Sequence, residues 1–490
     1  MLIQKLFKKE TVVESASFVL ILTVVEKIIV LIRGVTFARI LGPAEYGTYT
    51  LAFFLIPLVM PIARLGLPSC YERYIAQYEK KGALRDFLMK NFTLTLGSSI
   101  ILTMILSLFS RQISVMLFDS YQYRNIVLLC LISIIPNVIY ENMLASFNGL
   151  RIFKMSSLLK FNQIIIFTLI GIVLVVLHPF AISVVGANLL TFISVVTIFG
   201  YLVWKNILSP VSQSAKVLET NFYKKMFRYS VWFIITPLFS TLFSYTDRLV
   251  LNHFLGLHEV GIYSVAMNVS QLVFMFGMIT GNVLMPNLSK IWEDGDKDRV
   301  IFILNLAIKL TSLMILCYSF VFVLFRAEIL SFLYGNKYAD ATALIPILLL
   351  FWLNSSLIWL IGIYPNLIEK PYIPFFAIVP GFILNIFLNY IFIPIYVIKG
   401  AAIATLCSQM FVLIVLLLLY RREGMILNIN SIIMCLVPFI LLLNNLPIIF
   451  LFILVLAVII RSNLIMTKEE KVMVTQQFDK LLSKVIKHKK

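Results

Sequence analysis

The chain has 490 residues, of which 61% are hydrophobic and 13% charged, and its formal net charge is +18. Soluble proteins carry about 25% charged residues, so a water-soluble fold would leave too much apolar surface uncovered. Apolar runs of about 18 residues or more recur along the chain, and each is long enough to cross roughly 30 Å of hydrocarbon. The composition predicts an all-α polytopic membrane protein. It excludes a transmembrane β-barrel, whose strands would be short segments of alternating polarity.

About fourteen transmembrane helices are expected. Taken in chain order, the apolar runs predict spans near 13–38, 46–67, 91–110, 126–147, 159–178, 181–204, 229–250, 261–286, 301–325, 341–365, 372–394, 399–420, 429–445 and 447–461. The last two are short and only NNLP separates them, so a single re-entrant hairpin is the alternative there. The first span is too long and too charged for a cleaved signal peptide, so we expect it to remain as a helix.

Most of the 41 Lys and Arg residues fall on one side of this topology. They occupy the N-terminal segment, the loops after the even-numbered spans and the C-terminal tail. Because cytoplasmic loops are enriched in Lys and Arg, we expect both termini in the cytoplasm and the protein in the cytoplasmic (inner) membrane. The basic excess therefore reflects topology and attraction to anionic membrane lipids, and we expect no nucleic-acid partner.

Two short segments repeat each other. LGPAEYGTY (41–49) and LGLHEVGIY (255–263) share Leu, Gly, Glu, Gly and Tyr at positions 214 residues apart, and they follow the first and seventh spans. An even number of helices separates them, so both halves have the same orientation. This predicts two parallel six-helix bundles related by a pseudo-two-fold axis along the membrane normal, an arrangement that suits alternating access to a central cavity. We expect the glycines to cap helices and allow close packing, and the tyrosines to lie at interface depth.

The repeat divides the chain into parts. We predict an N-terminal six-helix bundle over 1–210, a C-terminal six-helix bundle over 211–425, an extra helix pair over 426–461 and a basic amphipathic cytoplasmic tail over 462–490. In the tail, the spacing of Thr467 and Glu470 predicts a capping box ahead of apolar residues at helical spacing. A frayed basic tail is the alternative.

Patterns for catalysis, metal binding and cofactors are missing from the sequence. The five cysteines form no CxxC pair and the four histidines are scattered, so we expect no metal and no cofactor. There is no GxxxxGK[ST] phosphate loop, which argues against ATP hydrolysis. The predicted external loops are short and hold no cluster of acids, which argues against a glycosyltransferase or polymerase. We therefore predict a transporter without catalytic residues, not an enzyme.

Segments around the repeat resemble a known family. RGVTFARILGPAEYGTYTLA, LGLPSCYERYIAQYEKKG and YTDRLVLNHFLGLHEVGIYSVA are similar to segments of polysaccharide-biosynthesis flippases of the multidrug/oligosaccharidyl-lipid/polysaccharide exporter superfamily. The resemblance implies a flippase that moves an undecaprenyl-pyrophosphate-linked oligosaccharide, such as a capsule or O-antigen repeat unit, to the outer leaflet. It also implies a monomer, which could associate with polysaccharide polymerase machinery.

Two alternatives to this function stay open. A count of fourteen helices is also similar to that of the lipid II flippase branch of the superfamily. The resemblance implies that the extra helix pair forms a groove for the lipid tail. A flippase for a peptidoglycan precursor is therefore one alternative. A cation-coupled small-molecule or multidrug exporter of the same superfamily is the other. Such an exporter would favour acidic residues in its cavity, whereas the charges within the predicted spans lean basic.

Ionisable residues inside predicted spans are the candidates for the substrate site, because a charge at the bilayer centre costs about 3 kcal/mol on insertion scales. Arginine and lysine suit a pyrophosphate, and Arg33, then Lys27 and Arg64, are the first candidates. Glu26 and Asp247 would pair with these cations in the empty site or carry a coupling H⁺ or Na⁺. The full set of cavity candidates is Arg33, Lys27, Glu26, Arg64, Asp247, Lys309, Asn268 and Gln271.

A structural role is the alternative for several of these cations. Arg33, Arg64 and Arg248 could extend their side chains to the membrane interface. We expect this of Arg64 and Arg248, which lie near the ends of predicted helices, whereas both roles stay open for Arg33.

Neutral polar residues form two stripes at helical spacing. Ser264, Asn268 and Gln271 share a face of the eighth span, and Asn385 and Asn389 share a face of the eleventh. Either stripe could line a hydrophilic lumen for sugar hydroxyls or form hydrogen bonds between helices.

Overall fold

A computed structural model of the chain describes residues 12–203, 205, 222–443, 445–461, 466, 467 and 470–472. Helix packing groups the chain into two compact units. One comprises Met1–Val265 with Leu333–Tyr338, and the other comprises Ala266–Phe332 with Ala339–Lys490. Residues 206–221 and most of the predicted tail lie outside the described residues.

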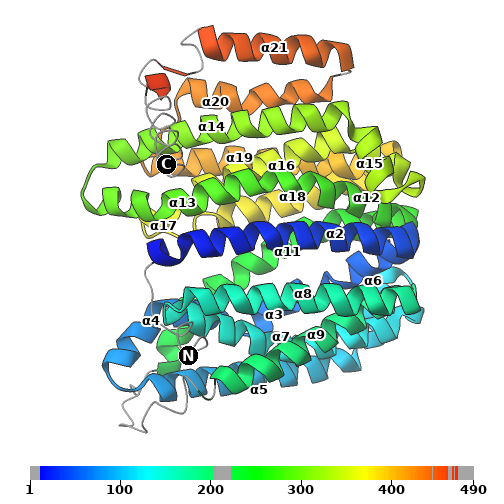
Figure 1. Cartoon of the computed structure of the whole chain (residues 1–490), viewed down its shortest axis with the longest axis vertical. Helices are drawn as coiled ribbons and strands as arrows, with labels where there is room; N and C mark the ends of the chain where they lie inside the picture. Colours follow the sequence, from blue (N-terminus) through cyan, green and yellow to red (C-terminus); the bar gives the residue numbers. More distant parts are fainter. Residues whose placement is uncertain are drawn as a thin grey trace, which may run out of the picture. The chain divides into compact units, whose positions relative to one another are not determined.

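The first unit consists of long helices joined by short turns (Figure 1). Its elements are α2 (Val12–Ala52), α3 (Leu55–Ala63), α4 (Pro68–Lys80), α5 (Leu84–Leu108), α6 (Ser110–Phe118), η1 (Tyr121–Tyr123), α7 (Arg124–Gly149), α8 (Phe153–Leu177), α9 (Ala181–Val203), α10 (Phe222–Ser230), α11 (Trp232–Leu255) and the first part of α12 (Leu257–Ser270).

Helix α7 is the centre of this unit. It packs against α3, α4, α5, α8 and α9, and Figure 1 shows α8 and α9 running beside it. Ile134, Val138 and Phe147 are among its fully buried side chains. A helix enclosed by so many neighbours must be apolar on most of its surface, and the α7 sequence meets that requirement.

The second unit follows the same plan of packed long helices. Its elements are η3 (Gln271–Val273), α13 (Phe274–Glu293), α14 (Lys297–Leu324), α15 (Arg326–Tyr334), η4 (Asn336–Ala343), α16 (Ile345–Ile361), α17 (Tyr364–Leu367), α18 (Phe375–Tyr396), α19 (Ile398–Arg422), α20 (Ile429–Leu436), η5 (Val437–Leu442) and α21 (Asn445–Arg461). Helix α16 is its core and packs against α13, α14 and α19.

Ten helices in the described part of the chain are long and apolar enough to cross a membrane. They correspond to the third through twelfth predicted spans. The two runs at the start fall on α2 and α3, where Gly42 interrupts the helical backbone. The last two runs fall on α20 with η5, a shorter apolar segment, and on the 17-residue α21. The multi-pass character is confirmed, whereas the number fourteen and the symmetry of two bundles stay predictions.

The glycines of the repeated segments interrupt the helices as expected. Gly42 has φ 74° and ψ 173°. Gly256, at the equivalent position, has φ 94° and ψ 176° and caps α11. A residue with a side chain rarely adopts this backbone conformation, so glycine is required at both corners.

The two repeated segments pack directly against each other. A Cβ atom on Gly47 would lie 2.0 Å from the Leu257 carbonyl oxygen, and one on Gly261 would lie 1.9 Å from the Pro43 carbonyl oxygen. These two contacts are related by the repeat, since Pro43 and Leu257 occupy equivalent positions. Nearby, the equivalent hydroxyls of Thr50 and Ser264 form a hydrogen bond of 3.0 Å. The backbones therefore meet where no side chain fits.

Alanine at Gly47 or Gly261 should separate the two segments, because its methyl group would overlap a backbone carbonyl that cannot move aside. We expect each substitution to destabilise the protein by about 1–3 kcal/mol, as overpacking does, and to lower its melting temperature in detergent. Gly97→Ala and Gly186→Ala are matched controls, since a Cβ there meets nothing within 4 Å. Equal melting temperatures for Gly47→Ala and these controls would contradict the close contact.

Candidate functional site

Arg33 lies on α2 in the first unit. The centre of its guanidinium group is 4.4 Å from the centroid of the Phe167 ring on α8. Its Nη1 atom is buried and has no hydrogen-bond partner. A buried donor without an acceptor costs free energy, and an anionic ligand would remove that cost. Arg33 therefore has a donor that the oxygen of a phosphate could satisfy.

Aromatic rings form the surroundings of Arg33. The rings of Phe37 and Phe167 are in edge contact at 6.2 Å, and those of Tyr49 and Phe53 at 4.7 Å. Tyr49 also interacts electrostatically with the guanidinium. These rings make the surroundings of the buried Nη1 atom apolar, which strengthens any charge interaction that a ligand makes with it.

Asp247 occupies the position of α11 that is equivalent to Arg33, 214 residues later, and Tyr263 is likewise equivalent to Tyr49. The Asp247 side chain is 1% exposed and accepts a hydrogen bond from the Tyr263 hydroxyl. Tyr263 is itself buried, and its hydroxyl binds the carboxylate, while its expected depth at the membrane interface stays a prediction. The two halves of the repeat carry opposite charges at the same place.

Arg248 differs from its expected role. Its side chain is 8% exposed and does not extend to an interface. Its Nε atom donates to the Ser264 hydroxyl at 3.1 Å, and its Nη1 atom donates to the Ser244 carbonyl at 3.1 Å. Because Ser264 also binds Thr50, Arg248 supports the contact between the repeated segments.

Glu26 and Lys27 lie nearer the start of α2 than Arg33 does. Glu26 is half-buried and interacts electrostatically with Lys160 of α8 as well as with Lys27, whose own side chain is exposed. Glu26 and Lys27 were candidates from the sequence, whereas Lys160 was not. A carboxylate between two cations stays available for rearrangement when an anion enters.

Arg64, just after α3, forms an ion pair with Glu141 of α7, with Nη1 and Oε2 3.0 Å apart. Its Nε atom is buried and has no hydrogen-bond partner. Sequence reasoning missed Glu141, although it is an acidic residue within the fourth predicted span. The criterion that selected Arg33, an ionisable residue inside a predicted span, also applies to Glu141.

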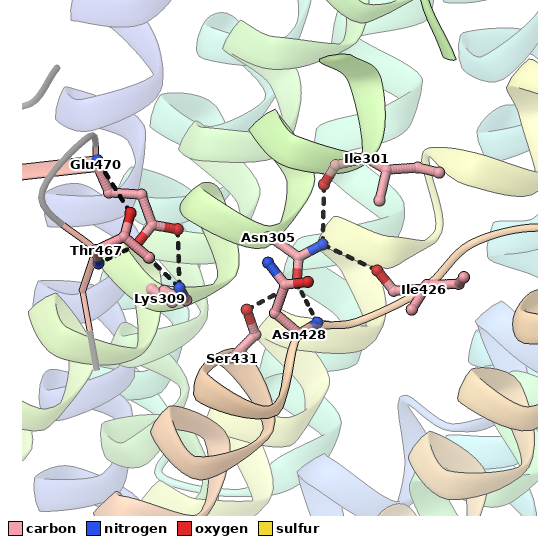
Figure 2. Close-up of polar contacts among 8 residues, drawn as sticks. All are labelled: Ile301, Asn305, Lys309, Ile426, Asn428, Ser431, Thr467 and Glu470. Atoms are coloured by element: carbon pink, nitrogen blue, oxygen red, sulfur yellow. Dashed lines mark hydrogen bonds and ion pairs between the residues drawn. The ribbon is translucent and has the colours of Figure 1, made fainter. Parts of the chain in front are cut away.

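Lys309 is engaged inside the second unit (Figure 2). Its ammonium group binds both carboxylate oxygens of Glu470, at 2.8 and 3.0 Å, and each side chain is 1% exposed. Glu470 also accepts from the Thr467 backbone amide at 2.8 Å, while its own amide donates to the Thr467 hydroxyl at 3.3 Å. The predicted capping box is confirmed. The acid that completes it also neutralises Lys309.

Asn305, one turn before Lys309 on α14, holds the segment that leads into α20 (Figure 2). Its amide nitrogen donates to the carbonyl oxygens of Ile301 and Ile426. Its amide oxygen accepts from the Asn428 backbone amide at 2.9 Å and the Ser431 hydroxyl at 2.7 Å. Two adjacent turns of α14 therefore anchor both the start of the last helix pair and the segment after it.

The residues of the two predicted polar stripes differ in burial. Ser264 is buried and bonded to Thr50, whereas Asn268 and Gln271 are exposed, and the helix tightens into a 3₁₀ turn at Gln271. Asn385 and Asn389 are buried within the second unit, where the amide nitrogen of Asn389 donates to the amide oxygen of Asn385 at 3.1 Å.

The candidate residues divide between the two units. The first unit holds Arg33, Lys27, Glu26, Arg64 and Asp247, and the second holds Lys309, Asn268 and Gln271.

Within the residues that the structure describes, no group of three or more His, Cys, Asp or Glu side chains could hold a metal ion.

The fold of this chain is similar to that of solved membrane proteins. The structure of the lipid II flippase MurJ in an inward closed conformation matches with a TM-score of 0.69 over 91% of this chain and 99% of that chain, at 18% sequence identity. The molecule is thus a multi-pass membrane protein with a MurJ-like fold. The profile of the family described as polysaccharide biosynthesis protein matches residues 36–343, well over half of the chain. The chain belongs to this family, and the family predicted from the sequence is confirmed.

Curated relatives match over shorter regions. The uncharacterized membrane protein MJ1068 of Methanocaldococcus jannaschii is 26% identical over 270 residues, which cover 54% of this chain and 52% of that protein. The probable low-salt glycan biosynthesis flippase Agl15 of Haloferax volcanii is 24% identical over 201 residues, or 41% of this chain and 43% of that one. The chain thus spans about half the length of the curated relatives that it matches.

Removing one partner of the Lys309–Glu470 pair should release the C-terminal segment. Lys309→Met or Glu470→Gln leaves a buried charge unpaired, which costs about 3–5 kcal/mol, so we expect a clearly lower melting temperature in detergent. The double variant Lys309→Met/Glu470→Met removes both charges and should recover most of the loss. Lys297→Met, on the exposed first turn of the same helix, is the control. If the double variant is no more stable than the single ones, the pair does not hold the segment.

Proposed function

We propose that this chain is a flippase that moves an undecaprenyl-pyrophosphate-linked oligosaccharide across the cytoplasmic membrane by alternating access. It acts as a monomer with both termini in the cytoplasm, and the oligosaccharide is a repeat unit of a cell-surface polysaccharide. The observation that carries the proposal is the buried guanidinium of Arg33, whose Nη1 atom has no hydrogen-bond partner. A pyrophosphate has the charge and the acceptor oxygens that this group lacks.

Family membership supports a substrate of polysaccharide biosynthesis. The relative Agl15 is described as a probable glycan biosynthesis flippase, in keeping with a lipid-linked glycan. Arg33 is the phosphate-binding residue in this proposal. Arg64 and Lys27 contribute positive charge, and Glu26 pairs with cations when the substrate has left.

An apolar cavity in the second unit supports a lipid-linked substrate. It has a volume of about 120 Å³, and its walls come from α14, α16, α19 and α20, including Ile308, Leu413 and Leu436. None of the described residues that line it is charged, so a hydrocarbon chain can occupy it without leaving a charge unpaired. We assign this cavity to part of the isoprenoid tail.

Asp247 is the candidate for ion coupling. It is a buried carboxylate in a membrane-spanning helix, held by the Tyr263 hydroxyl. A carboxylate in this setting can exchange a proton or bind Na⁺, and either event changes the charge that the site offers to an anion. The opposite charge of the equivalent Arg33 gives a means to link ion and substrate.

Arg33 should be essential for transport. In proteoliposomes with lipid-linked oligosaccharide, Arg33→Ala should slow flipping by about 10- to 100-fold, the effect of losing a charge-assisted hydrogen bond, and Arg33→Lys should restore part of it. Arg111→Ala, which removes an exposed arginine of α6, is the matched control. Lipid II and a cationic dye are tested in the same assay, as substrates of the two alternative functions. Wild-type rates in Arg33→Ala, or transport of the dye alone, would refute the proposal.

Asp247→Asn should uncouple transport from the ion gradient, because the amide keeps the shape of the carboxylate but carries no charge. We expect flipping in wild-type proteoliposomes to rise several-fold under an imposed H⁺ or Na⁺ gradient, and the variant to show no such rise. Ser244→Ala, at an exposed position about one turn before Asp247 on α11, is the control. An unchanged gradient response in Asp247→Asn would exclude Asp247 as the coupling residue.

A further inference from the structure

A second cavity in the second unit has a different chemistry from the lipid-tail cavity. Its volume is about 460 Å³, within the range of about 300–1,000 Å³ that small-molecule sites occupy. Its walls come from α13, α16, α19 and the segments around α17 and the start of α18. Among the described residues that line it, none is charged. A pyrophosphate or an organic cation would therefore find no counter-charge there.

Trp359 of α16 presents a flat aromatic surface to this cavity. Its side chain is 47% exposed although it lies within a packed helix layer. Gly281 of α13 allows this position, because a Cβ there would lie 3.1 Å from the indole ring. The Phe274 ring meets Trp359 edge-on, with centroids 5.8 Å apart. The indole is thus supported by α13, and a large part of its surface stays open.

Polar groups surround this aromatic surface. The amide nitrogen of Gln409 donates to the Ser355 hydroxyl at 3.0 Å, and that bond does not use the Gln409 amide oxygen. The side chains of Asn282 and Asn366 are exposed at the cavity wall. Amide groups both donate and accept, so they suit ligands with hydroxyl groups. A hydrocarbon chain in the same place would leave them without partners.

Tyr420 supplies the observation that points to a ligand. Its side chain is 1% exposed and lines the cavity, yet its hydroxyl has no hydrogen-bond partner. Buried polar groups are nearly always satisfied, so an unpartnered hydroxyl at a cavity wall indicates that a partner arrives from the cavity.

We propose that this cavity is a glycan subsite, in which a sugar ring of the substrate stacks on Trp359 and its hydroxyls bond to Tyr420 and the surrounding amides. Sugars have an apolar face of C–H groups and a rim of neutral hydroxyls, which match an aromatic plane ringed by uncharged donors and acceptors. The assignment rests on the proposed function, because it takes the sugar as part of the lipid-linked substrate.

A larger cavity continues from this subsite. It has a volume of about 820 Å³, and Asn366 lines both cavities. The rings of Trp292 and Tyr364 meet there at 5.9 Å, and the carboxylates of Glu369 and Glu423 lie along its wall. Carboxylates accept hydrogen bonds from hydroxyl groups, so this space accommodates further sugars of the oligosaccharide.

The test measures binding to the full-length protein in nanodiscs. The probes are farnesyl pyrophosphate and farnesyl pyrophosphate carrying glucose, galactose or N-acetylglucosamine. Wild type should bind at least one glycosylated probe more tightly than the bare one. Tyr420→Phe should weaken only that glycosylated probe, by about 3- to 10-fold, the effect of one neutral hydrogen bond. Trp359→Ala should weaken the same probe further and leave the bare probe within 2-fold of wild type.

Tyr318→Phe is the matched control, because Tyr318 of α14 lines neither cavity. Since the Tyr420 hydroxyl has no partner in the protein, its removal should not impair folding, which melting temperatures would verify. The glycan subsite is refuted if no sugar improves wild-type binding, or if Tyr420→Phe and Trp359→Ala leave the glycosylated probe unaffected. Equal weakening of bare and glycosylated probes would also refute it, and would assign the cavity to the lipid tail. Arg33→Ala tests the proposed function separately, because it should weaken bare and glycosylated probes alike.

Discussion

The first unit depends on the close approach of two backbones at Gly47 and Gly261. Each glycine leaves room for a carbonyl of the other repeated segment, and any side chain would force the segments apart. The hydrogen bond between Thr50 and Ser264 continues this contact between equivalent positions, and Arg248 reinforces it from α11. Because the contact is made by backbone and small side chains, it tolerates little variation in distance. It therefore fixes how α2 and the corner between α11 and α12 approach each other.

The same internal repeat places the opposite charges of Arg33 and Asp247 at equivalent positions. Arg33 and Asp247 each lie sixteen residues before a tyrosine of the repeat, yet one is a cation and the other an acid. Asp247 is already satisfied by Tyr263, whereas Arg33 keeps an unpartnered donor. An internal repeat provides two similar frameworks, and in the function proposed above the difference in charge between them assigns anion binding to Arg33 and ion coupling to Asp247.

Two other cations among the described residues form ion pairs with acids from distant helices or segments. Glu141 binds Arg64, and Glu470 binds Lys309 deep in the second unit. A buried ion pair contributes little net stability, but loss of one partner is costly, so such pairs specify which segments dock where. The Lys309–Glu470 pair has this effect on the segment that follows α21. Lys309 is thus fully engaged in holding the fold, whereas Arg33 and Arg64 each keep one buried nitrogen without a hydrogen-bond partner.

The sequence alone determined the membrane character, the placement of ten apolar helices and the family, because apolar runs and the repeated segment are local patterns. It also determined the capping box at Thr467 and Glu470, whose spacing is local. Only the tertiary structure decided which charges were already paired, because Glu141 and Glu470 lie far along the chain from Arg64 and Lys309. The same holds for the cavity at Trp359, whose walls come from helices that are distant in sequence. Pairing and cavities arise from the meeting of separate segments, and a pattern within one segment does not contain that information.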